Sequence, residues 1–462
     1  MSQMTQDLSR LYPEIVVLIT AAGALVFEML RMPRAALAWA LAGLALATGL
    51  TLPLLGMNVD VFGGTLRIDT LSLWAKLILL PATMLSLLLA RAELAGSDRE
   101  GTVYSLLCFV TFGALILAGS GDTMFLVLGV LLSSLGSLAL VAYPRNDAAT
   151  EAAMKFFVFA SVTGGVMIFG LTYWFGATGS TLLSSLGRLE AFPLAAAIGL
   201  VAVMTGLGYK AALAPFHFWA PDAYVGAPIS IAGYLSVVPK IAAIFALAQV
   251  MRDLSPSTGW ALIIAGLAAL SMVWGYLAAL AQENVIRLLA YSSIAQAGYF
   301  LLGIVAIGVS PLALPSLVMF AAAYAAMNLG AFAIVQRTGF SLESFAGMGR
   351  ATPIRGAAMT LFLLSLVGIP PLAGFAGKFL LFGAAMDAGF TWLALLAIVN
   401  SVLALAAYLR IIVPMYKPPA AHNKSFFHLD ASPHLITLVW SVSVIVTLGL
   451  GIAGQWVLSA IQ

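Results

Sequence analysis

Three lysines lie deep inside apolar stretches of the sequence. Lys210 is found in MTGLGYKAALAPFHFW, Lys240 in LSVVPKIAAIFAL and Lys378 in LVGIPPLAGFAGKFLL. A lysine at the centre of a membrane helix costs at least about 2.5–3.5 kcal/mol. Burial favours the neutral amine and a nearby acid favours the charged one, so a buried lysine can exchange a proton. The three residues indicate a proton relay; the alternative is that each is a structural partner of a buried carbonyl or acid.

A proline or glycine lies near each lysine and disturbs its helix. Pro215 follows the first lysine by five residues, Pro239 directly precedes the second, and the GIPP run at 368–371 precedes the third. Proline removes a backbone donor and frees the carbonyl one turn earlier. In lipid, such groups are tolerated only inside protein or beside a watery cavity. A broken helix with an ionisable residue is typical of transporter sites, so the pattern favours ion translocation.

Two further titratable residues follow the first lysine. His217 has an unperturbed pKa near 6.5 and could pass protons between water and Lys210; alternatively, it hydrogen-bonds a helix end. Asp222 follows Pro221, and we expect it to serve its loop. A fourth lysine inside a span, Lys76, lies nearer the start of that span, where a structural role and a relay role are both open.

Polar residues recur on one face of a later apolar stretch. Ser292, Ser293, Gln296 and Tyr299 are spaced three and four residues apart, so a helix places them on one face. Such a face in a membrane protein either holds water or joins helices through hydrogen bonds. Both interpretations are open for this stretch.

The composition defines the class of protein that positions these residues. Of the 462 residues, 62% are hydrophobic and 8% are charged, with a net charge of +3. Soluble domains carry about 25% charged residues. A soluble enzyme, a disordered protein and a nucleic-acid binder are therefore excluded. Cys108 is the only cysteine and there are four histidines, so we expect no disulfide, iron–sulfur cluster, Cys-type zinc site or haem pair in this chain.

Windows of about 20 apolar residues predict about fourteen membrane helices, and hence an all-α polytopic membrane protein. The spans near 228 and 356 are the least regular. The expected limits are 12–30, 36–56, 69–90, 103–119, 122–143, 154–175, 192–214, 228–250, 259–281, 286–308, 314–336, 356–382, 389–410 and 434–458.

Basic residues predict the orientation of these spans. Loops after odd-numbered spans, with the adjoining span ends, hold thirteen Lys and Arg residues, whereas the opposite side holds four. The excess places the odd loops in the cytoplasm and both termini outside. The longest polar loop, 417–434, is expected to be a solvated connector. The alternative is a metal site formed by His422, His428 and Asp430, which lack the usual ligand spacing.

Four stretches resemble hallmarks of the antiporter-like membrane subunits of respiratory complex I. They are EAAMKFF at 151–157, GLGYKAALAPFHFWAPDAYVGAP at 206–228, RLLAYSSIAQAGY at 287–299 and SLVGIPPLAGFAGKF at 365–379. Within this family the chain looks most like the subunit N branch, because a lysine occupies the broken twelfth helix and the sequence stops just after the last span. The subunits of cation/proton antiporter complexes share the motif set.

The resemblance implies a fold of fourteen helices with two inverted five-helix repeats and discontinuous helices. It divides the chain into helices 1–3 (1–102), a first repeat (103–250), a second repeat (251–416), and a loop with the last helix (417–462). It also implies roles for the lysines: Lys210 as proton donor and acceptor, Lys240 as the bridge along a polar axis, and Lys378 as the terminal exchange site. Gln296 stands where some members have histidine, so proton transfer there would need water.

The implied partners are the other membrane-arm subunits of a complex I-like assembly in a prokaryotic plasma membrane. Flavin, iron–sulfur clusters and quinone would belong to the parent complex, and this chain would carry no cofactor. The leading hypothesis is therefore a proton-translocating subunit of an NADH-quinone oxidoreductase. Two alternatives are a subunit of a Na⁺/H⁺ antiporter assembly and a purely structural membrane subunit.

One departure from the family pattern concerns the fifth helix. Family members carry a glutamate there that pairs with the lysine of the seventh helix, but residues 123–143 contain no acid. Gly129 or its neighbours occupy the expected place, and Asp122 at the edge lies about seven residues, or roughly 10 Å, away. Either another acid, such as one from a neighbouring subunit, replaces the glutamate, or this half has altered or lost its pumping role.

Overall fold

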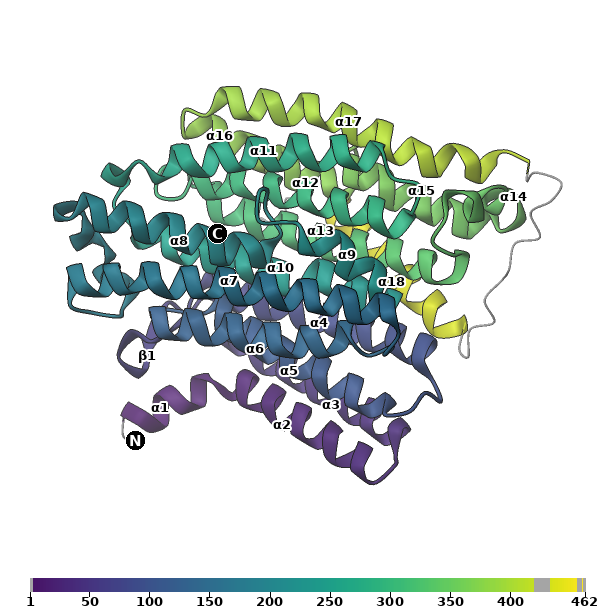
Figure 1. The fold of residues 1–462 in the computed structure, drawn as a ribbon, viewed down its shortest axis with the longest axis horizontal. Helices are drawn as coiled ribbons and strands as arrows, with labels where there is room; N and C mark the ends of the chain where they lie inside the picture. The colour runs from purple at the N-terminus through teal and green to yellow at the C-terminus, as the bar shows by residue number, and fades with distance from the viewer. Residues whose placement is uncertain (1–2, 419–432, 455–458, 460–462) are drawn as a thin grey trace.

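The computed structural model describes residues 3–418, 433–454 and 459, and nearly all of them are helical (Figure 1). The α-helices are α1 (Gln3–Arg10), α2 (Tyr12–Met29), α3 (Pro33–Thr51), α4 (Thr70–Leu94), α5 (Glu100–Ala118), α6 (Thr123–Val141), α7 (Asp147–Thr178), α8 (Pro193–Ala211), α9 (Trp219–Gly226), α10 (Ile229–Asp253), α11 (Trp260–Leu280), α12 (Val285–Val305), α13 (Ala313–Thr338), α14 (Met348–Ala351), α15 (Pro353–Val367), α16 (Ala373–Asp387), α17 (Thr391–Tyr416) and α18 (Pro433–Ile452). Short 3-10 helices cover Leu52–Leu54, Phe62–Gly64, Leu183–Ala191, Pro256–Thr258 and Leu342–Phe345.

The membrane crossings agree with the expectation from the sequence. Thirteen of the described helices are long and apolar enough to span a bilayer. A fourteenth crossing is divided between α15 and α16, which have 15 residues each. Each is about 22 Å long, too short alone for a hydrocarbon core of about 30 Å. The prediction of an all-α polytopic fold with about fourteen spans is confirmed.

Two crossings are interrupted next to a lysine. Helix α8 ends at Ala211, and Ala212 takes the left-handed conformation (φ 56°) before the short helix α9 begins. Helix α15 ends at Val367, the next residue, Gly368, takes the left-handed conformation (φ 98°), and α16 begins after two prolines. By contrast, Pro239 lies inside α10, which runs unbroken over 25 residues. The expected break beside Lys240, in the span judged among the least regular, is therefore wrong: this proline only removes one backbone donor.

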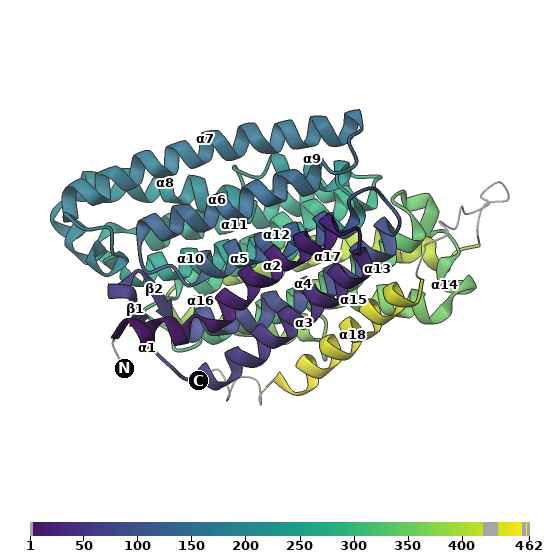
Figure 2. The ribbon, with the colours of Figure 1, turned by 90° about the horizontal axis from the view of Figure 1, so that it is seen from below.

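The most buried helices occupy the centre of the bundle. The apolar part of α10 is completely buried, and α12 and α13 are nearly so. Figures 1 and 2 show these three helices surrounded by the others, with α2, α7 and α18 at the periphery. Lys240 lies on α10 and Gln296 on α12, so the fold places both in its interior.

A small hairpin joins α3 to α4 at one end of the bundle. Its strands β1 (Val59–Val61) and β2 (Leu66–Ile68) are antiparallel, with Val59 opposite Ile68. Helix α4 follows directly, and the side chain of Asp69 caps it by accepting a hydrogen bond from the Ser72 amide. The hairpin lies at the same end as α1 (Figure 1).

Candidate functional site

Lys240 lies on the central helix and contacts the polar face of α12. Its Nζ donates hydrogen bonds to Ser293 Oγ (2.6 Å) and to the Ser293 carbonyl (2.8 Å). The lysine is completely buried, and both acceptors are neutral. The structure thus brings together a buried amine and a hydroxyl that can accept or pass on a proton.

The break between α15 and α16 forms the surroundings of Lys378. Its Nζ donates to the carbonyls of Leu366 (2.9 Å) and Val367 (3.1 Å), which are among the last of α15. The terminal carbonyls of a helix have no partner within the helix, so they are free to accept. The amine also lies 3.8 Å from the centre of the Tyr299 ring, a cation–π distance.

A glycine makes room for this lysine. Gly368 has φ 98°, a conformation that side chains rarely adopt, and a Cβ placed there would lie 3.1 Å from Lys378 Cδ. A larger residue at this turn would strain the backbone and displace the lysine at the same time. The GIPP run thus shapes the site as well as ending the helix.

Gln296 connects the Lys378 site to α11. Its Nε2 donates to the same Leu366 carbonyl (2.9 Å) and to the hydroxyl of Tyr276 (2.8 Å). Its Oε1 is buried and has no hydrogen-bond partner within the described residues. A buried acceptor without a partner costs free energy unless a water molecule satisfies it. This position is thus suited to a bound water.

Two tyrosines continue the connection towards Lys240. The hydroxyls of Tyr276 and Tyr408 are 3.3 Å apart, and Tyr408 is hydrogen-bonded to Ser292. Ser292 precedes Ser293, the partner of Lys240, in the chain. We call this set the polar row; it runs between Lys240 and Lys378 through Ser293, Ser292, Tyr408, Tyr276, Gln296 and the Leu366 carbonyl.

Lys210 lies apart from the polar row, in the last turn of α8. Its Nζ donates to Ser134 Oγ on α6 at 2.9 Å, and the residue is 2% exposed. Within the described part of the chain, no carboxylate forms an ion pair with it. Ser134 lines a cavity of about 80 Å³ between α6 and α7, together with apolar residues that include Leu131 and Leu138.

The expected place of the missing acid is Gly129 or its neighbours, and the structure shows that Gly129 itself does not face the lysine. A Cβ on Gly129 would lie 2.8 Å from the Leu117 backbone, so Gly129 faces α5 and not Lys210. The α6 residue that faces the lysine is Ser134. Asp122 is occupied in capping α6, where it accepts from the Met124 amide, and it lies twelve residues, or about 18 Å, before Ser134.

His217 follows the break after α8 but does not contact Lys210 through a hydrogen bond in the described structure. Its Nε2 accepts a hydrogen bond from Trp274 Nε1 on α11 (2.9 Å), and its Nδ1 is buried without a partner within the described residues. Because Nε2 is the acceptor, Nδ1 carries the proton of the neutral ring. A water molecule at Nδ1 would satisfy this donor.

Asp222 joins three helices rather than serving a loop. It lies in α9, and its carboxylate contacts Lys155 Nζ on α7 (2.9 Å) and Arg287 Nη1 on α12 (2.9 Å). Residues of three of the four motifs therefore meet here. All three side chains are partly exposed, as expected for an ion-pair cluster at the end of the bundle. The expectation that Asp222 serves its loop is wrong.

Lys76 forms a separate buried ion pair. Its Nζ lies 2.7 Å from Glu14 Oε1 on α2, and the two side chains are 1% and 8% exposed. The pair joins α4 to α2, and neither residue belongs to the polar row. Breaking a buried pair by removing one partner typically costs about 3–5 kcal/mol. This geometry favours a structural role for Lys76.

Carboxylates that the sequence reading missed hold both ends of the helix that carries Lys240. At the start of α10, Glu93 accepts hydrogen bonds from the amides of Ile229 and Ser230 (both 2.8 Å). At its end, Gln249 and Arg252 each donate to Asp69 Oδ2 (both 2.9 Å). A carboxylate at a helix N-terminus is favoured by the helix dipole. The sequence alone gives little indication of the contact between Glu93 and α10, because Glu93 lies 136 residues from its partner Ile229.

Within the described residues, no group of three or more His, Cys, Asp or Glu side chains could hold a metal ion. The alternative metal site in the 417–434 loop involves His422, His428 and Asp430, which lie outside the described residues.

Comparisons with known proteins give consistent matches. The family model described as "NADH:quinone oxidoreductase/Mrp antiporter, TM" matches residues 120–404. The chain is 36% identical to NADH-quinone oxidoreductase subunit N 1 of Streptomyces griseus, over 90% of each chain. It is 37% identical to subunit N of Desulfovibrio desulfuricans, over 89% of this chain and 87% of the relative. It is 35% identical to F(420)H(2) dehydrogenase subunit N of Methanosarcina mazei, over 87% and 85%.

Solved structures share the fold. A chain of respiratory complex I from Thermus thermophilus with bound aureothin aligns with a TM-score of 0.86 at 31% identity, over 97% of this chain and 99% of that one. A chain of the Mrp complex from Dietzia sp. aligns with a TM-score of 0.84 at 21% identity, over 98% and 96%, which shows the fold alone.

Proposed function

Because the chain belongs to the NADH:quinone oxidoreductase/Mrp antiporter transmembrane family, we propose that it is an N-type, proton-translocating membrane subunit of a complex I-type NADH-quinone oxidoreductase. The family resemblance expected from the sequence is confirmed. The partners are the other membrane subunits of that assembly. Electron transfer, with its flavin, iron–sulfur clusters and quinone, takes place in other subunits.

The polar row is the observation that carries the proposal of proton transfer. Lys240 and Lys378 are buried at its two ends, and hydroxyl groups of Ser292, Tyr276 and Tyr408 lie between them. A hydroxyl both donates and accepts, so a series of hydroxyls can pass a proton along. In this proposal Lys240 is the bridge, and Lys378 exchanges protons at the break between α15 and α16.

The proposed path needs water at two points. The first is between Ser293 and Ser292, which follow each other in the chain but share no hydrogen bond within the described residues, since the Ser293 hydroxyl donates to the Ala290 carbonyl. The second is at Gln296. Gln296 does not ionise, and the Leu366 carbonyl only accepts hydrogen bonds, so neither hands a proton to Lys378 directly. A water at Gln296 Oε1, which has no hydrogen-bond partner within the described residues, would bridge this second gap. His217 lies beside the broken seventh crossing, and its Nδ1 has no partner within the described residues; it would exchange protons between water and Lys210.

The membrane orientation and internal repeats complete the proposal. The excess of basic residues in the odd loops supports both termini outside the cytoplasm of a prokaryotic cell, with the chain in the plasma membrane. Residues 103–250 would form the first five-helix repeat and residues 251–416 the second. One interrupted crossing with a lysine in each segment, α8–α9 and α15–α16, supports this division.

Proton pumping by the reconstituted assembly tests the relay. Lys378→Ala should lower the number of protons translocated per electron, because it removes the amine at one end of the polar row. Lys417→Ala, which changes an exposed lysine outside the membrane helices, is the matched control and should leave pumping unchanged. Unchanged stoichiometry in both Lys378→Ala and Lys210→Ala would contradict the relay.

The alternative is a subunit of a Na⁺/H⁺ antiporter, because the description of the matching family names Mrp antiporters as well. The subunit N relatives cover most of the chain at higher identity, which supports the oxidoreductase. Purification from native membranes distinguishes the two. Flavin and iron–sulfur absorbance that copurifies with the chain supports the first, whereas sodium-dependent proton exchange without these chromophores supports the second.

A further inference from the structure

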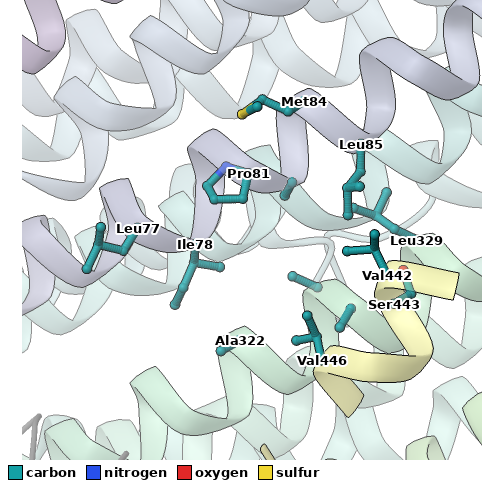
Figure 3. A pocket seen from close by; sticks show the side chains of 13 residues that line it. Leu77, Ile78, Pro81, Met84, Leu85, Ala322, Leu329, Val442, Ser443 and Val446 are labelled. Atoms are coloured by element: carbon teal, nitrogen blue, oxygen red, sulfur yellow. The ribbon is translucent and has the colours of Figure 1, made fainter. Parts of the chain in front are cut away.

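A cavity lies on the side of the bundle away from the polar row. It has a volume of about 360 Å³ and lies between α4, α13 and α18. Figure 3 shows α4, with Pro81, on one side of this space, and α13 and α18, with Ala322 and Ser443, on the other. Protein interiors have few voids larger than a water molecule. Ligand pockets, in contrast, typically enclose about 300–1,000 Å³.

Small residues create the space. Ala322, Ala325 and Ala326 lie on the wall formed by α13, and Ala82 lies on the wall formed by α4. The remaining lining is apolar except for Ser443. On the side of α18, Val446 is 37% exposed on the outer surface of the bundle, where lipid would surround the protein. The walls therefore fit a hydrocarbon chain that enters from the membrane.

One polar side chain in the cavity has no hydrogen-bond partner among the residues that the structure describes. Ser443 is completely buried, and its Oγ makes no hydrogen bond within the described structure. A buried hydroxyl without a partner costs free energy. Leu77 and Pro81 also line the cavity, and Pro81 has no N–H to donate to the Leu77 carbonyl one turn earlier. A ligand oxygen that bonds to Ser443 would remove this cost.

The depth of the cavity restricts the kind of lipid. Pro81 is the twelfth of 25 residues in α4, Ala326 the fourteenth of 26 in α13, and Ser443 the eleventh of 20 in α18. All three positions are near the middle of a membrane helix. The ester carbonyls and charged headgroup of a phospholipid lie at the edge of a core about 30 Å thick. A ligand oxygen at the depth of Ser443 therefore belongs to a neutral lipid without a charged headgroup.

We propose that the cavity between α4, α13 and α18 binds a neutral long-chain lipid whose oxygen atom pairs with the hydroxyl of Ser443. Two sources share this chemistry: an isoprenoid quinone and a diacylglycerol. The proposal does not depend on the proton path, because α13 separates the cavity from Lys240. Tyr324 and Asn328 on the opposite face of α13 bond to Ser236 of α10.

Photolabelling of the complete assembly in native membranes tests the site. Three diazirine-bearing probes are compared: a ubiquinone analogue, dioleoylglycerol and a phosphatidylcholine. We expect one neutral probe to label peptides of α4, α13 or α18 and an excess of the same unlabelled lipid to compete. The probe that labels identifies the source. Equal labelling by phosphatidylcholine would overturn the proposal.

Three variants decide whether the cavity itself is labelled. Ala326→Phe fills the space and should abolish labelling, whereas Ile445→Phe, at a position of α18 that is 69% exposed, should not change it. Ser443→Ala should lower labelling about fivefold, the typical net effect of one lost hydrogen bond. If Ala326→Phe does not assemble, Ser443→Ala decides alone, since it removes one oxygen atom. Undiminished labelling of either variant would show that no such site exists.

Discussion

Of the three lysines expected to form the relay, two lie at the ends of the polar row, whereas the third is paired with a single hydroxyl. Lys378 has two carbonyls and the face of Tyr299 as partners, and Lys240 has both oxygens of Ser293. Lys210 has Ser134. The first two surroundings offer an ammonium group several electron-rich partners. Burial alone therefore does not make a lysine part of a proton pathway. A lysine joins a pathway when polar groups on neighbouring helices lie within hydrogen-bonding distance of its amine.

We expect the largest difference in proton pumping between the alanine variants of Lys240 and Lys210. Lys240→Ala removes the amine that joins the polar row to α10, and a positioned acid or base is typically worth about 100-fold or more in proton transfer. Lys210→Ala should retain more than half of the pumping, because this lysine lies outside the row. The measurement is proton uptake per electron in proteoliposomes. Equal losses in the two variants would remove the distinction between the two regions.

A carboxylate near Lys210 should restore the pairing that this chain lacks. Leu131 lies one helical turn before Ser134 and lines the same cavity, so Leu131→Glu should place an acid beside the amine. In a double-mutant cycle with Lys210→Ala, we expect a coupling free energy of about 1–3 kcal/mol in the stability of the purified assembly.

Leu128→Glu is the matched control for this variant, because Leu128 is about as exposed on α6 as Leu131 (42% against 46%) but does not line the cavity. It should show no coupling to Lys210. If Leu131→Glu also shows none, Ser134 and Lys210 do not mark the place of the missing acid.

We expect the smallest effect on proton pumping from replacing a tyrosine of the polar row. Tyr276→Phe removes a hydroxyl between Gln296 and Tyr408, and should slow proton transfer severalfold while costing about 1 kcal/mol of stability. Tyr234→Phe removes another buried hydroxyl, one that bonds to Thr111 and to the Leu107 carbonyl outside the row. It should have a similar effect on stability without slowing pumping. Equal slowing in both variants would indicate that the row has no special part in transfer.

The sequence predicted the fold well because the controlling signal is local. A run of apolar residues long enough to cross the bilayer is visible without knowledge of its neighbours, so the crossings and the interruption before Lys378 could be read directly. The three relay lysines were found by the same reasoning, since charge is rare in such runs. The effect of Pro239 could not be read, because a packed helix can accommodate a proline that sequence rules treat as a break.

The polar row was only partly visible. Ser292, Ser293 and Gln296 share one helix face, which their spacing revealed. Tyr408 was missed because it comes from another helix, 116 residues from its partner Ser292. Contacts across such distances depend on how helices pack, which no local pattern encodes. Asp222 was misread for the same reason, since its partner Arg287 lies 65 residues away.

The helix that carries Lys240 is fixed at both of its ends. Glu93 holds its first amides, and Asp69 holds side chains of its last turns. A rod anchored in this way can neither slide along its axis nor swing about one end without breaking several charge-assisted bonds. Energy passing through the protein must therefore reach this lysine as a change in electric field or as a turn of its flexible side chain. Helix α10 thus keeps its position along its axis while the charge of the Lys240 side chain changes.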